Sequence, residues 1–130
     1  MLTQRAALIL RVHASLLFFL AVALIVRPSS LAEFMGFKAL ATTPELIWSF
    51  RSMGVLLLLP ALLGPVVAAF AGERGLRQAA AGMAFISSCV GVVTLLAPIG
   101  ISAGKILLSI LWFLFALLYF YALRGRGRNR

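Results

Sequence analysis

Four apolar runs fill most of this 130-residue chain, and they constrain its fold more than any other feature. We expect helices at about residues 6–26, 45–70, 78–97 and 102–123. A helix needs about twenty apolar residues to cross the hydrocarbon of a bilayer, and each run supplies roughly that many. The chain is therefore predicted to be all-α, an integral membrane four-helix bundle with antiparallel up-down-up-down topology. It would form a single transmembrane domain over residues 1–130, ending in a basic cytoplasmic tail at residues 124–130.

The composition argues against a soluble domain. Hydrophobic residues make up 63% of the chain and charged residues 12%, with a mean hydropathy of +1.10. Soluble domains are about half apolar and about a quarter charged, so a soluble fold would leave too much apolar surface in water. The single cysteine, Cys89, allows no disulfide within the chain, and we expect it to be a buried, inert thiol.

The net charge of +9 predicts a lipid partner rather than nucleic acid, because the basic residues flank the apolar runs. One side of the bilayer would hold the N-terminus, the second loop at residues 71–77 and the arginine-rich tail, and the other side would hold the remaining basic residues. The first group is Arg5, Arg11, Arg74, Arg77, Arg124, Arg126, Arg128 and Arg130, and the second is Arg27, Lys38, Arg51 and Lys105. Since the cytoplasmic side carries the excess, both termini should be cytoplasmic, in a bacterial inner membrane. A signal peptide ending near Ala32 is an alternative for the first run.

The loops and small residues predict how the helices start, stop and pack. In the first loop, a short amphipathic helix capped by Ser29 or Ser30 should end at Gly36. Small residues recur every four positions at Gly64, Ala68 and Gly72, and again at Ala80, Ala84 and Ser88, followed by Gly91. The helices at 45–70 and 78–97 should form an antiparallel hairpin, with the second stripe docked on the first or second long helix. Pro60 and Pro65 should kink the helix that contains them.

The first candidate site lies at the start of the second long helix. Glu45, Trp48, Arg51 and Ser52 are spaced by three and four residues, so they share one helix face. A charge at the depth of Arg51 needs a partner, and such a residue is a functional hypothesis by default. Together with Lys105, this face could bind an anionic, lipid-like ligand. The alternatives are that Arg51 pairs with a loop group to fix the helix, and that Lys105 anchors the interface.

His13 and Trp112 are the second candidate set, as polar side chains in the membrane interior. The simplest expectation for His13 is a hydrogen bond to a neighbouring helix. Tyr119 and Tyr121 are expected at the far interface, in an aromatic belt. A single histidine, no aspartate and three glutamates near loops supply no metal cluster and no catalytic set. We therefore expect no cofactor, no metal and no catalytic residue.

Several stretches resemble the DoxX-like small four-helix membrane proteins, in particular a branch of unknown function. They are RPSSLAEFMGF after the first helix, FRSMGVLLLLPALLG, the hairpin GERGLRQAA and the ending YALRGR, with Pro28, Gly36, Arg51 and Gly54 at the matching positions. The chain departs from the pattern in Arg-Ser-Met-Gly, where relatives often carry a tyrosine and a glycine pair. The resemblance implies a left-handed four-helix bundle. Some relatives are thought to accompany quinone-linked oxidoreductases, and others act as membrane chaperones or accessory subunits.

Three functions remain open on the sequence. The first is a non-enzymatic accessory subunit or binder of a lipid-like or anionic ligand, with the bilayer, a membrane protein or a second copy as partner. The second is a small dimeric transporter, although Glu33 falls in a loop where such a protein needs a membrane carboxylate. The third is a quinone-contacting subunit of a membrane oxidoreductase, with His13 or Trp112 near the ring.

Overall fold

The computed structural model describes residues 2–38 and 43–124, and this part of the chain contains five helices and no strand. The helices are α1 (Leu2–Val26), α2 (Pro28–Met35), α3 (Pro44–Phe70), α4 (Glu73–Leu96) and α5 (Ala103–Arg124). All except α2 are long and apolar enough to cross a membrane. Beyond Arg124, the expected basic tail lies outside the described residues.

Two helices start earlier than the sequence suggested. The first begins at Leu2 rather than near residue 6, and α4 begins at Glu73 rather than near residue 78. The predicted second loop therefore shrinks to Ala71 and Gly72, both of which have extended backbone. The polar residues at positions 73–77, predicted to lie in this loop, are good helix formers and belong to α4. Glu73 in the first turn of α4 also complements the positive end of the helix dipole.

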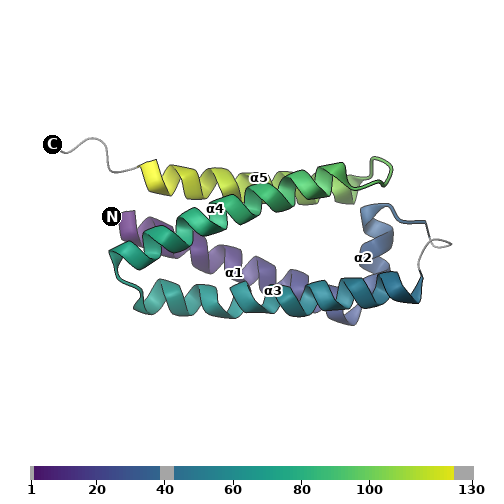
Figure 1. Ribbon diagram of the computed structural model, residues 1–130, viewed down its shortest axis with the longest axis horizontal. Helices are drawn as coiled ribbons and strands as arrows, with labels where there is room; N and C mark the ends of the chain where they lie inside the picture. Colours follow the sequence, from purple (N-terminus) through teal and green to yellow (C-terminus); the bar gives the residue numbers. More distant parts are fainter. Residues whose placement is uncertain (1, 39–42, 125–130) are drawn as a thin grey trace.

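The short helix α2 lies across the ends of the long helices (Figure 1). It begins at Pro28 with Arg27 as N-cap and no side-chain cap, so the predicted serine cap is wrong. Proline suits this position because the first helical N–H has no partner to lose. The predicted stop is confirmed, since Gly36 takes a left-handed conformation with φ of 98°.

Two contacts fix α2 against the start of α5, and a third caps α5 itself. The Ser102 hydroxyl donates a 2.6 Å hydrogen bond to the Met35 carbonyl oxygen and accepts one from the Lys105 backbone N–H. Gly104 lies so close to the backbone of Phe34 that a side chain at this position would clash. The same short segment of α5 thus caps its own helix and holds α2 in place.

The long helices pack mainly as two pairs, α1 with α3 and α4 with α5 (Figure 1). Glycines bring α3 onto α1: a Cβ added at Gly54 would lie 2.9 Å from the Ala21 carbonyl oxygen, and one at Gly64 would lie 3.0 Å from the Ala14 Cβ. The predicted hairpin is therefore only partly correct, because the short connection joins α3 to α4 but each packs chiefly on another helix. Gly72, the last member of the first small-residue stripe, has no neighbour within 4 Å of an added Cβ. Both prolines lie within one continuous helix, α3.

The second small-residue stripe faces α5, which corrects its predicted docking on the first or second long helix. Ala80, Ala84, Ser87 and Gly91 are the buried small residues of α4, and the Phe113 ring lies over Gly91. The stripe follows the true helical repeat of 3.6 residues and so passes through Ser87 rather than the predicted Ser88. Half-buried Ser88 instead donates a hydrogen bond to the Ala84 carbonyl oxygen.

The two pairs share one buried cluster near the start of α1. Leu10 of α1 packs there with Leu76 of α4 and with Phe115 and Tyr119 of α5. A smaller cluster joins the pairs further along, where Leu17 and Ala61 meet Trp112.

Gly54 provides a test of the pairing of α1 with α3. We expect Gly54→Ala to destabilise the protein by about 1–3 kcal/mol, because the added methyl group overpacks a backbone contact. The measurement is reversible unfolding in mixed detergent micelles. Gly82→Ala is the matched control, since an added Cβ there meets nothing within 4 Å and should be neutral or slightly stabilising. Equal stability of the two variants would contradict the close approach.

Candidate functional site

An apolar cavity of about 220 Å³, here called the interpair cavity, lies between the two helix pairs. All five helices contribute to its wall; examples in chain order are Leu20, Met35, Leu57, Val90 and Leu108. Among the described residues, no ionisable side chain lines it. Such a cavity suits an uncharged, apolar occupant, because a charged group would find no partner there.

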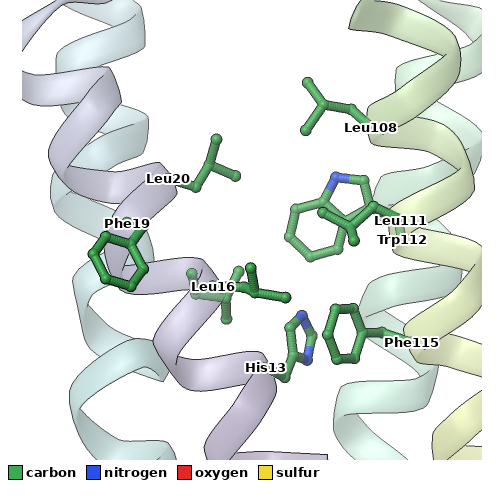
Figure 2. A pocket seen from close by; sticks show the side chains of 9 residues that line it. His13, Leu16, Phe19, Leu20, Leu108, Leu111, Trp112 and Phe115 are labelled. Carbon is green, nitrogen blue, oxygen red and sulfur yellow. The ribbon is translucent and has the colours of Figure 1, made fainter.

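A second cavity of about 300 Å³, the His13 cavity, lies between α1 and α5 (Figure 2). Leu17, Leu20, Leu108 and Trp112 line both cavities, so the two spaces adjoin along these side chains. The remaining wall of the His13 cavity is apolar apart from His13 itself. Together the cavities offer an elongated, largely apolar space, and two of its side chains, His13 and Trp112, carry a ring nitrogen without a hydrogen-bond acceptor among the described residues.

His13, Trp112, Phe115 and Tyr119 form a compact group, the His13 cluster. The imidazole is only 1% exposed and stacks on the Phe115 ring, with centroids 4.0 Å apart and planes inclined by 9°. The Trp112 indole meets it nearly edge-on at 5.8 Å. The Tyr119 hydroxyl, which is fully buried, lies 3.0 Å from His13 Nδ1. Three side chains of α5 thus surround the histidine, which α1 carries.

The hydrogen bond with Tyr119 determines where the imidazole carries its proton. Within the part of the chain that the structure describes, Nδ1 is the one acceptor available to the Tyr119 hydroxyl. A buried hydroxyl proton needs an acceptor, so Tyr119 donates to Nδ1 and the neutral ring carries its proton on Nε2. Figure 2 shows the second ring nitrogen turned toward the cavity. No described residue accepts a hydrogen bond from it.

His13 and Trp112 are both buried within the protein, and the expected hydrogen bond from His13 to another helix is confirmed. The prediction for Tyr119 is wrong, because this side chain is buried and only Tyr121 is exposed. Helical spacing was the signal that could have found it. Trp112, Phe115 and Tyr119 are three and four residues apart, so they share the face of α5 turned toward α1.

The first candidate face lies on the outside of α3. Glu45, Trp48 and Arg51 are exposed and Ser52 is half-buried. In the described residues, neither a hydrogen bond nor an ion pair links Arg51 to another group. The structure leaves this face open to whatever surrounds α3, and its predicted role in binding is untested.

Lys105 does not join that face. Its side chain is buried, and the ammonium donates hydrogen bonds of 2.8 Å and 3.1 Å to the carbonyl oxygens of Ala97 and Ile99. These carbonyl groups belong to the connection between α4 and α5, so Lys105 neutralises the unpaired end of α4. A basic pair with Arg51 is therefore absent from the described contacts.

The structure also corrects the prediction for Cys89, which is exposed on α4 rather than buried. Among the described residues, no group of three or more histidine, cysteine or acidic side chains could hold a metal ion. Comparison of the chain with protein-family models, curated proteins and solved structures gave no match.

The proton position on His13 can be measured directly, because the chain has a single histidine. We expect nitrogen-15 NMR to show a neutral imidazole protonated at Nε2. Removing the hydroxyl with Tyr119→Phe should destabilise the protein by about 1–3 kcal/mol, since a buried nitrogen loses its partner. Tyr121→Phe, at an exposed ring, should change neither the spectrum nor the stability. Protonation at Nδ1 in the unmodified protein would contradict the assignment.

Proposed function

We propose that this chain is an integral membrane protein whose four long helices cross the bilayer with antiparallel up-down-up-down topology. Both termini would lie in the cytoplasm, in a bacterial inner membrane. The arginine distribution supports this orientation, since Arg5, Arg74, Arg77 and Arg124 would then face the cytoplasm. The start of α1 and the end of α5 lie at the same end of the molecule, as this arrangement requires (Figure 1).

Its function, in this proposal, is to bind a lipid-like ligand without transforming it, as an accessory subunit or carrier within the membrane. The supporting observation is the interpair cavity, an apolar space with walls from all five helices. An apolar ligand in this cavity would gain packing contacts along its walls.

An uncharged ligand fits this site better than the anionic ligand suggested by Arg51 and Lys105. Neither cation lines the interpair cavity, and the Lys105 ammonium is already bonded to two carbonyl groups. Exposed Arg51 would then contact headgroups near the membrane surface, where its side chain can reach water. Trp48, which is 71% exposed one turn earlier, suits the same interfacial position.

A quinone-contacting subunit is the second candidate, and the His13 cluster favours it. A flat ring could pack against Trp112 and Phe115, and a carbonyl oxygen could accept a hydrogen bond from His13. The transporter alternative has less support, since Glu33 and Glu45 are exposed and line neither described cavity.

Membership of the DoxX-like group also stands as a proposal. Its support is the order of features along the chain. Pro28 opens the short helix after α1, Gly36 ends that helix, and Gly54 packs α3 on α1. Arg51 matches the position of the arginine in that pattern, but its exposed side chain has no partner in the described structure that would give it a role.

The proposal is tested by filling the cavity. Val90 lines the interpair cavity, whereas Val93, on the same helix, is 68% exposed. Native mass spectrometry in mild detergent should show a bound lipid-like molecule in the unmodified protein and in Val93→Phe. In Val90→Phe its occupancy should fall about tenfold, because the new ring occupies the ligand's volume. Retention of the same molecule by Val90→Phe, or a bare protein in every sample, would refute binding at this site.

A further inference from the structure

We propose that His13 Nε2–H is the recognition donor for an uncharged lipid bearing a carbonyl oxygen, held in the His13 cavity with its apolar tail in the interpair cavity. This inference rests on the proposed function and specifies the ligand class for the same site. It is carried by a polar group that is buried, without a partner in the described chain, and aimed into a cavity.

The donor is one of only two unpaired N–H groups in a largely apolar wall, and the other is the Trp112 indole. Burying an N–H group without an acceptor costs about 1–3 kcal/mol, so a ligand that supplies an acceptor gains that amount at this point. A carbonyl oxygen accepts a hydrogen bond without bringing a charge. A ligand headed by an ammonium group would meet a second donor rather than an acceptor.

The depth of His13 in the bilayer determines which lipids could reach its N–H group, and it favours neutral lipids over phospholipids. His13 lies two residues from Ser15, the midpoint of the Gln4–Val26 span, which is about 3 Å along the helix axis. Phe115, stacked on the imidazole, lies about 2 Å from the midpoint of α5. The hydrocarbon core is about 30 Å thick, so a donor displaced about 3 Å toward the cytoplasmic side would lie about 12 Å from the nearer headgroup region, toward which the exposed Arg11 side chain would extend. A phospholipid ester anchored at the surface would not reach it, whereas an uncharged lipid can lie wholly inside the bilayer.

The shared wall explains how one molecule would use both cavities. Leu17, Leu20, Leu108 and Trp112 border both spaces, and a chain passing beside them leads from the His13 cavity into the interpair cavity. The carbonyl end would then lie beside His13 and Trp112, and the tail would extend toward Met35 of α2.

The test compares two probes with the same carbon skeleton, dodecanophenone and dodecylbenzene, each brominated on its aromatic ring. Binding brings the bromine into the bundle, where it quenches Trp112, and Trp48→Phe removes the other tryptophan from the signal. In reconstituted full-length protein, the ketone should bind about tenfold more tightly than the hydrocarbon. The infrared carbonyl band of the bound ketone should shift to lower frequency.

The variant that isolates the donor is His13→Phe combined with Tyr119→Phe. Removing both partners leaves no orphaned hydroxyl, so the double variant should fold, and its preference for the ketone should disappear. Tyr119→Phe alone keeps the imidazole and should keep most of the preference. Phosphatidylcholine serves as the ester-bearing competitor, and it should not displace the ketone.

The outcomes separate this inference from the function on which it depends. Binding of neither probe, with no lipid lost from Val90→Phe, would refute the proposed function itself. Equal binding of ketone and hydrocarbon, or an unshifted carbonyl band, would overturn the role of His13 while leaving an apolar binding site. A ketone preference that survives in the double variant would assign recognition to another donor. Displacement by phosphatidylcholine would overturn the restriction to neutral lipids.

Discussion

Close backbone contact at small residues is the constraint on which the rest of this structure depends. Inside a bilayer the hydrophobic effect does not drive helices together, so packing decides which helices pair. Gly54 and Gly64 admit α1, and Gly91 admits the Phe113 ring of α5. Because these contacts tie α3 to α1 and α4 to α5, the chain forms two tight pairs. The space between the pairs is filled less completely, and both cavities border it.

The His13–Tyr119 hydrogen bond couples these pairs, since it links α1 to α5. It also orients the imidazole, and the stack on Phe115 holds the ring plane. One interaction therefore contributes to the assembly of the pairs and leaves a donor turned toward the cavity. Without the tyrosine, the imidazole could exchange its proton between the two nitrogens, and only a bound acceptor would hold the proton on Nε2.

The sequence was sufficient for the four long helices, because their apolar runs are long. The start of α3 is also marked by Thr43, whose hydroxyl accepts a hydrogen bond from the Leu46 backbone N–H. The sequence was insufficient for helix pairing. Glycine spacing shows that a face is compatible with close approach, but several helices offer such faces, and only their three-dimensional fit selects the partner. The interior placement of His13 and Trp112 followed from their positions in the apolar runs.

The cavities themselves could not be predicted, because they arise where side chains from five helices fail to meet. The role of Lys105 could not be predicted from sequence for a similar reason. A lysine near a helix start suggests an interfacial anchor, but the ammonium bonds to the carbonyl groups of Ala97 and Ile99, which only the folded α4–α5 connection presents. The sequence therefore predicted the polar residue of the site, His13, but it did not predict the residues that form the cavity walls.

The crosswise position of α2 has a consequence for how a bound molecule would exchange. Leu31 and Met35 of α2 line the interpair cavity, and Ser102 and Gly104 hold this helix in place across the ends of the long helices. With the four long helices crossing a bilayer as proposed, the gaps between them would open sideways into hydrocarbon. Occupancy would then follow the mole fraction of the lipid dissolved in the membrane rather than its vanishing aqueous concentration. The ligand would then exchange between the protein and the surrounding lipid without passing through water.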